Sequence, residues 1–218
     1  GSNVQLSASH DATNVNFIGG AATIFENCRA SDQFGLGTGF QCNGGCLLSS
    51  VRVDNQLTGI QTNGSSVLRN PSINRCTVGV DCTGGENTVF GGSIFGCTID
   101  AVRLKGDDTV SDCRIDSTGG GTAILVEGTG NTVTDNHISR GGFHGIYVKG
   151  TESTNNTVTG NICSHQVFAI RVESAGNLIM ANFACGASNT NYEIAPGNKV
   201  GSISTDPTTA NAWANHED

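Results

Sequence analysis

The sequence predicts an all-β fold, a single-stranded right-handed parallel β-helix of about eight or nine coils. The main observation is a recurring phrase: an apolar residue, one residue, an apolar residue, one residue, then usually Gly. Its copies begin 20, 20, 22, 22, 22 and 24 residues apart, at 40–44, 60–64, 80–84, 102–106, 124–128, 146–150 and 170–174. A period of this length indicates stacked units, each of which buries its apolar edge against its neighbours.

Composition supports the same prediction. The chain has 31 Gly and one Met, and charged residues make up 14% of it. Asn, Thr, Ser, Val and Ile are abundant instead, as is typical of short strands joined by tight turns. Parallel strands joined without helices at this period form a solenoid, and a right-handed winding is the default for parallel connections.

A second phrase lies between the copies of the first. It carries apolar residues at its first and sixth positions and Asn or a small residue at its fourth, as in 110–115, 133–138, 158–163 and 179–184. The fourth position is predicted to be a corner, because Asn tolerates left-handed backbone and can hydrogen-bond to the Asn of the next coil. Asn136, Asn161 and Asn182 are therefore expected to form a ladder, with Cys113 and Gly92 in the same register.

The repeat divides the chain into three parts. Residues 1–19 are predicted to be a tag scar and an irregular N-terminal lead-in, 20–200 the parallel β-helix, and 201–218 a C-terminal strap or cap. The only Trp, Trp213, is the expected anchor of the strap. A solenoid needs a cap at each end, and none is visible at the N-terminus, so an upstream domain of a longer protein is expected.

Net charge, hydropathy and cysteine spacing argue against several classes of partner and site. The net charge of −8 argues against a nucleic-acid partner, and no apolar run approaches the ~18 residues of a membrane-spanning segment. The nine cysteines include no Cys-x-x-Cys motif and are predicted to be buried free thiols. Cys76 and Cys97, expected on adjacent coils about 4.8 Å apart, are the pair within reach of a disulfide.

The segment 131–138, followed by Gly145-Ile146-Tyr147-Val148, resembles the repeat of the right-handed, pectate-lyase-like β-helix superfamily. The NosD-like and mannuronan-epimerase-like carbohydrate-binding repeats are the most similar, and the resemblance covers roughly residues 20–200. It implies a polysaccharide partner and an extracellular, cell-surface or virion location. A homotrimer is compatible with it, because phage β-helices are often trimers. No catalytic signature of one branch maps onto this chain.

Polar side chains are expected to converge on one outer surface. Arg114 and His137 share a register, and Asp116 and Ser139 share the next position but one, with Ser164 beside them. Arg140 and His165 follow in the next position. Asp116 could act as a base or acid, the arginines could bind a uronate carboxylate, and a histidine could shuttle protons. Solvated polar residues on an exposed face explain the pattern equally well. The predicted catalytic residues are Asp116, His137 and His165, and the predicted substrate-binding residues are Arg114, Arg140, Tyr147 and Phe143.

Other charged residues favour structural interpretations. Asp112 and Asp135 share a register on adjacent coils and could supply the two carboxylates that glycoside hydrolysis needs. They also occupy corner positions, where Asp is favoured because it tolerates the backbone conformation of a turn. Lys105, Glu127, Lys149 and Glu173 alternate in sign and predict a salt-bridge ladder. No cofactor and no transition-metal site is expected, and Asp107-Asp108 is only a weak calcium candidate.

Two functions remain open from the sequence. The first is an extracellular polysaccharide-recognising β-helix, with lyase, hydrolase or epimerase activity in an outer groove as an extension. The alternative is a non-catalytic structural or adhesive module of a cell-surface or phage-tail protein.

Overall fold

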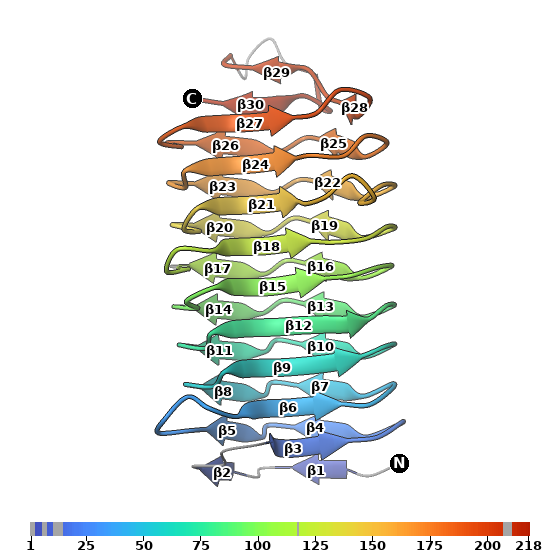
Figure 1. Cartoon of the computed structure of the whole chain (residues 1–218), viewed down its shortest axis with the longest axis vertical. Coiled ribbons are helices and arrows are strands. Elements are labelled where there is room, and N and C mark those ends of the chain that lie inside the picture. The colour runs from blue at the N-terminus through green and yellow to red at the C-terminus, as the bar shows by residue number, and fades with distance from the viewer. Residues whose placement is uncertain (1–2, 6–7, 11–14, 117, 207–210) are drawn as a thin grey trace.

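The computed structural model describes residues 3–5, 8–10, 15–116, 118–206 and 211–218. It confirms the predicted fold: three parallel sheets wind into a β-solenoid of about eight turns. Figure 1 shows the coils stacked along one axis, with the strands of each sheet above one another. No helix occurs among the described residues.

Each coil contributes one strand to each sheet. Sheet A contains β1 (Asn3–Gln5), β4 (Ile24–Glu26), β7 (Leu47–Ser49), β10 (Val67–Arg69), β13 (Thr88–Phe90), β16 (Thr109–Ser111), β19 (Thr132–Thr134), β22 (Thr157–Thr159), β25 (Leu178–Met180) and β28 (Lys199–Val200). Sheet B contains β2 (Ala8–His10), β5 (Arg29–Ser31), β8 (Arg52–Asp54), β11 (Ser72–Asn74), β14 (Ser93–Phe95), β17 (Arg114–Asp116), β20 (His137–Ser139), β23 (Ile162–Ser164), β26 (Phe183–Cys185), β29 (Ile203–Ser204) and β30 (Asn215–Glu217). Sheet C contains β3 (Val15–Gly19), β6 (Thr38–Cys42), β9 (Thr58–Asn63), β12 (Val78–Gly84), β15 (Asp100–Leu104), β18 (Thr122–Val126), β21 (His144–Val148), β24 (Phe168–Val172) and β27 (Thr190–Ile194).

The first sequence phrase forms sheet C. Its apolar residues point inward and stack in register, so that Val80, Val102 and Ile124 follow one another along the core and are fully buried. The second phrase forms sheets A and B and the corner between them. This corner is made by residues in the left-handed region, among them Asp112 and Asp135, each with φ of 54°. Their predicted corner role is confirmed.

The predicted asparagine ladder is present at the corner between sheets A and B. The side-chain amide of Asn136 donates to Oδ1 of Asn161 at 3.0 Å, and that of Asn161 donates to Oδ1 of Asn182 at 3.0 Å. Oδ1 of Asn136 accepts from the backbone N–H of Cys113, and Asn215 extends the ladder at the other end. The ladder therefore satisfies buried backbone groups as well as its own amides.

A second ladder, which the sequence interpretation missed, lies at the corner between sheets C and A. Its successive members are hydrogen-bonded to one another, Asp108 to Asn131 through its backbone N–H and the others through their side-chain amides: Asn87, Asp108, Asn131, Asn156, Asn177 and Asn198. Asp108 is fully buried there and accepts from the backbone N–H groups of Asn87 and Lys105. These bonds engage both oxygens of its carboxylate.

The ends differ from the prediction. Strands β1, β2 and β3 pair with β4, β5 and β6, so coil structure is present before residue 20, whereas an irregular lead-in was expected. Gly1 and Ser2 lie outside the described residues.

At the C-terminal end, strand β30 adds to sheet B beside β26, and Trp213 is 65% exposed. The prediction that Trp213 anchors the C-terminal segment is wrong; Ala214 and Asn215 are the buried residues. The boundary at residue 200 stays a prediction.

All nine cysteines are free thiols, and Cys185 is the one that is not fully enclosed. Burial raises the pKa of Cys76 to about 11 and that of Cys97 to about 12. The predicted buried thiols are confirmed, and Cys76 and Cys97 are not joined in this structure. They fill core space beside Ile73 and Ile94, which are paired in register.

The predicted salt-bridge ladder is only partly formed. Lys149 Nζ lies 3.2 Å from Glu127 Oε1. Glu173 instead accepts from the backbone N–H of Gly150 and lies 3.4 Å from Arg171. The reason is that Tyr147, one coil below Arg171, also donates its hydroxyl to Glu173.

Candidate functional site

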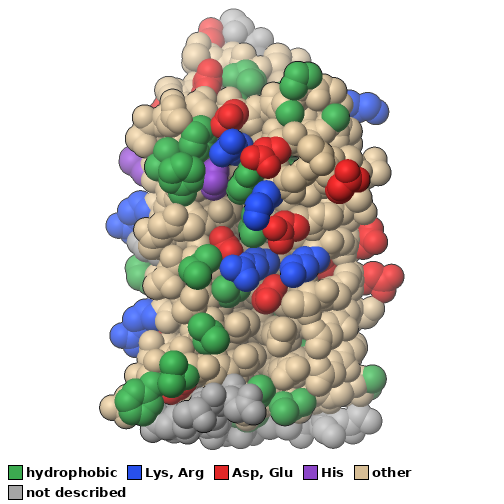
Figure 2. Space-filling model, viewed as in Figure 1, with side chains coloured by type: hydrophobic (Ala, Val, Ile, Leu, Met, Phe, Trp, Pro, Cys, Tyr) green, Lys and Arg blue, Asp and Glu red, His purple; other side chains and the backbone are tan. Residues whose placement is uncertain are grey.

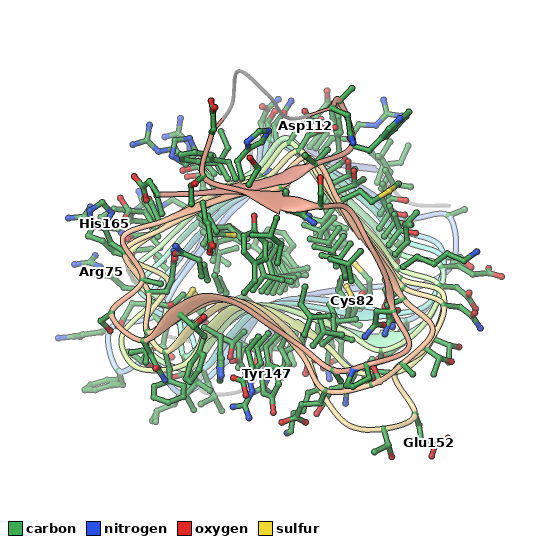
Figure 3. The ribbon with its side chains drawn as sticks, turned by 90° about the horizontal axis from the view of Figure 1, so that it is seen from above. Arg75, Cys82, Asp112, Tyr147, Glu152 and His165 are labelled. Atoms are coloured by element: carbon green, nitrogen blue, oxygen red, sulfur yellow. The ribbon has the colours of Figure 1, made fainter. Side chains whose placement is uncertain are left out.

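The residues predicted to form a site fall on two different faces. Register places Arg114 beside His137 and Asp116 beside Ser139 on sheet B, as predicted. Tyr147 belongs to sheet C, and Phe143 directly precedes its strand β21. Figure 3, which looks along the axis, shows Tyr147 and His165 projecting from different sides of the cross-section. The structure therefore does not bring the predicted catalytic and substrate-binding residues into one groove.

The carboxylate of Asp116 is engaged in a clamp between two coils. Arg140 donates from Nε to Asp116 Oδ1 at 2.9 Å and from Nη2 to Oδ2 at 2.7 Å, a bidentate pair. The same arrangement occurs three coils earlier, where Arg75 binds Asp54 through both oxygens. Arg75 and Arg140 both have φ near 50°, which turns their side chains back toward the preceding coil. Repetition of the clamp favours a register-fixing role for Asp116 and Arg140.

Asp116→Ala is expected to lower the melting temperature by a few degrees. Arg140→Ala should have a similar effect, and the double variant should be little worse than either, because both remove the same interaction. Thermal unfolding followed by circular dichroism measures this. Asp54→Ala is the matched control, since the Asp54–Arg75 clamp should behave alike. Additive losses in the double variant would contradict the clamp.

A groove of about 540 Å³ lies on the outer face of sheet C. Figure 2 shows that acidic and basic side chains gather on this face, over the middle and upper coils. The groove crosses the coils of β15, β18 and β21. Its lining side chains include Asp100, Arg103, Lys105, Thr122, Leu125, Glu127, Phe143, His144, Tyr147 and Lys149.

The charges of the groove are unevenly paired. Arg103 Nε lies 2.7 Å from Asp100 Oδ2, and Lys149 pairs with Glu127. Lys105 is exposed, and no ion pair is recorded for it in the described part of the chain. Three cations against two carboxylates leave the groove with a local excess of positive charge on a protein whose net charge is −8. Such a groove can hold a carboxylate-bearing ligand.

An aromatic cluster forms one wall of the groove. The ring of His144 stacks on that of Tyr147 with centroids 4.3 Å apart, and Phe143 contacts His144 edge-on at 4.7 Å. Phe168 also stacks on His144, with ring centroids 5.5 Å apart. The guanidinium of Arg171 lies 5.3 Å from the rings of both Tyr147 and Phe168. Phe143, Tyr147 and Phe168 thus form an aromatic patch with His144 at its centre.

His144 and Tyr147 have perturbed acidities. Burial, reinforced by the nearby cation Arg171, lowers the pKa of His144 to about 4, so its imidazole is neutral near pH 7. Its Nδ1 lies 3.3 Å from the hydroxyl of Thr122, and its buried Nε2 has no partner. Burial and the hydrogen bond to Glu173 raise the pKa of Tyr147 to about 12, while that bond lowers the pKa of Glu173. The phenol therefore stays protonated and the carboxylate stays charged.

Among the described residues, no group of three or more His, Cys, Asp or Glu side chains could hold a metal ion.

The sequence interpretation missed the groove because it treated Lys105 and Lys149 only as members of a salt-bridge ladder. The signal was available in the periodicity. Arg103, Leu125, Tyr147 and Arg171 share one outward register, and residues 105 and 149 follow two positions later.

Comparison with known proteins agrees with this architecture. Residues 100–200 match a family model described as a right handed beta helix region. The chain has the fold of a right-handed parallel β-helix. The periplasmic alginate epimerase AlgG is similar in structure, with a TM-score of 0.61 and 15% identity over 92% of this chain and 49% of the epimerase chain. The β-helix thus spans about half the length of that epimerase.

A second solved structure, the Dettilon tailspike protein, aligns with a TM-score of 0.38 and 12% identity over 79% of this chain and 43% of that one. No curated protein matches the sequence. The described part of the chain contains no helix that is long and apolar enough to span a membrane.

Proposed function

We propose that this β-helix binds an acidic polysaccharide along the outer groove of sheet C. The observation that carries the proposal is the juxtaposition of Arg103, Lys105 and Lys149 with the aromatic wall of Tyr147 and Phe143. A uronate offers a carboxylate to the cations and an apolar ring face to the aromatic side chains. The open groove crosses adjacent coils, as an extended sugar chain requires.

The similarity to an alginate epimerase in fold supports a uronate-containing chain as the ligand class. A polysaccharide ligand in turn implies an extracellular, cell-surface or virion location. A homotrimer stays a prediction.

Lys105→Gln and Tyr147→Ala are each expected to weaken binding of a polyuronate, such as polygalacturonate or alginate, by about tenfold, which corresponds to ~1.4 kcal/mol. Isothermal titration with defined oligomers measures the affinity. Lys199→Gln is the matched control, because Lys199 is an exposed lysine on sheet A. Binding of neutral dextran with equal affinity, or equal loss in Lys199→Gln, would refute recognition of acidic sugar by this groove.

A catalytic function is the second candidate, with Asp116, His137 and His165 as the reacting groups and Arg114 and Arg140 as uronate ligands. The observation in its favour is that Arg114 and His137 are exposed neighbours on sheet B. Incubation with the same polymers, followed by ultraviolet absorbance and by reducing ends, detects a lyase or a hydrolase. Proton exchange at the uronate detects an epimerase. Activity lost in His137→Ala, with folding intact, supports this candidate, and activity retained there removes it.

A further inference from the structure

Two arginines on sheet B lie directly opposite one another. Arg29 of β5 and Arg52 of β8 are partners in register on adjacent parallel strands, about 4.8 Å apart at the backbone. Both side chains are exposed, and both point to the same side of the sheet. Like charges placed directly opposite in a sheet are unfavourable. Their retention in a protein of net charge −8 therefore requires a reason.

Within the described residues, four of the six other arginines are paired with a carboxylate, and Arg69 and Arg114 are not. Arg75, Arg103, Arg140 and Arg171 each have a carboxylate within 3.4 Å. No ion pair is recorded for Arg29 or Arg52 in the described ranges. The carboxylate of Asp54, two residues after Arg52, is occupied by Arg75 and by the amide of Asn74. Glu26 lies on sheet A and does not line the cleft between the arginines.

The arginines line a shallow cleft of about 600 Å³ together with neutral donors. Asn27, Ser50 and Asn70 occupy successive turns of the corner between sheets A and B, with φ of 55°, 53° and 50°. Ser72 follows Arg52 in the strand register. The cleft thus presents two guanidinium groups, two hydroxyls and two amides, and no carboxylate. Each guanidinium carries five donors and has no acceptor function.

We propose that this cleft binds a tetrahedral oxyanion group, a sulfate or phosphate ester carried by a polysaccharide. Two unpaired guanidinium groups match two negative charges, and donors on three successive coils suit the several acceptor oxygens of such a group better than the planar pair of a carboxylate. The site lies on sheet B in the N-terminal half of the coil stack, apart from the groove of sheet C. It does not depend on the function proposed for that groove.

The test uses the intact protein with dextran sulfate as the probe and unmodified dextran as its uncharged counterpart, at constant ionic strength. Dextran sulfate is expected to bind and dextran not to bind. Arg29→Gln and Arg52→Gln should each weaken binding by about tenfold. Inorganic sulfate and inorganic phosphate, titrated separately, decide which oxyanion the cleft prefers.

Arg69→Gln is the matched control. Arg69 is an exposed arginine on sheet A, in register with Ser49 and Phe90, and it does not line the cleft, so the variant should retain binding. Thermal unfolding without ligand should show Arg52→Gln at least as stable as the wild type, because it relieves the repulsion. An equal loss of affinity in Arg69→Gln would show that the effect comes from overall charge and would overturn the site. Absence of binding, or polygalacturonate binding that Arg29→Gln and Arg52→Gln weaken as much as dextran sulfate binding, would also overturn it.

Discussion

Asn161→Ala is expected to destabilise the β-helix by about 3–5 kcal/mol. Asn161 is fully buried, and its Oδ1 accepts from both the backbone N–H and the side-chain amide of Asn136 at 3.0 Å. Its amide nitrogen donates to Asn182 Oδ1 and to the carbonyl of Val133. Truncation leaves several buried polar groups without partners, and each costs about 1–3 kcal/mol.

Urea unfolding at equilibrium measures this loss. Thr159→Ala, two residues earlier on the outer face of sheet A, is the matched control and should change stability by less than about 0.5 kcal/mol. Asn161→Cys separates hydrogen bonding from volume, because Cys113 already occupies this register. It should recover little of the loss. A variant as stable as the wild type would show that the ladder contributes no net stabilisation.

The first ladder was predictable and the second was not, for a geometric reason. Asn136, Asn161 and Asn182 follow strands β19, β22 and β25 after the same number of residues, so the repeat displays their register directly. The members of the second ladder follow turns of different length. Asn131 comes five residues after the end of β18, whereas Asn156 comes eight residues after the end of β21. A fixed period does not reveal a position that follows a variable turn.

The candidate groove shows a second limit of predicting side-chain positions from the sequence repeat. Strict alternation outward from Tyr147 places Gly145 outside and His144 inside. In the structure Gly145 and Ile146 both face inward: a Cβ on Gly145 would lie 3.4 Å from Cys163 Cβ, and Ile146 is fully buried. The register between β21 and β24 skips Gly145 accordingly. This irregularity turns His144 outward into the groove, where sequence periodicity could not place it.

Register also explains why only part of the sheet B prediction holds. The pairing of Arg114 with His137 follows from strand alternation and is confirmed. Arg140 and His165 follow their strands at left-handed corners, with φ of 50° and 62°. There the chain direction changes, and Arg140 reaches back one coil to Asp116. A corner side chain cannot be assigned to a face by counting residues.

His144 is expected to make the protein acid-sensitive between pH 6.5 and about 4. The unfolded chain binds a proton on this imidazole as the pH falls below its ordinary pKa of 6.5, whereas burial holds the pKa in the folded chain at about 4. The stabilisation from keeping His144 neutral is therefore complete above pH 6.5 and is lost progressively as the pH falls toward 4. At ~1.4 kcal/mol per pKa unit, the whole effect amounts to up to about 3 kcal/mol.

His144→Phe should reduce this pH dependence, because Phe preserves the stacking on Tyr147 and Phe168 but takes up no proton. The free energy of unfolding in urea at pH 7 and pH 5 measures it, with the wild type losing more stability than the variant. His137→Phe is the matched control, since His137 is exposed on sheet B and should leave the difference unchanged. An equal pH dependence in His144→Phe and the wild type would show that another group carries the acid sensitivity. In that case the aromatic wall of the groove would not depend on a neutral imidazole.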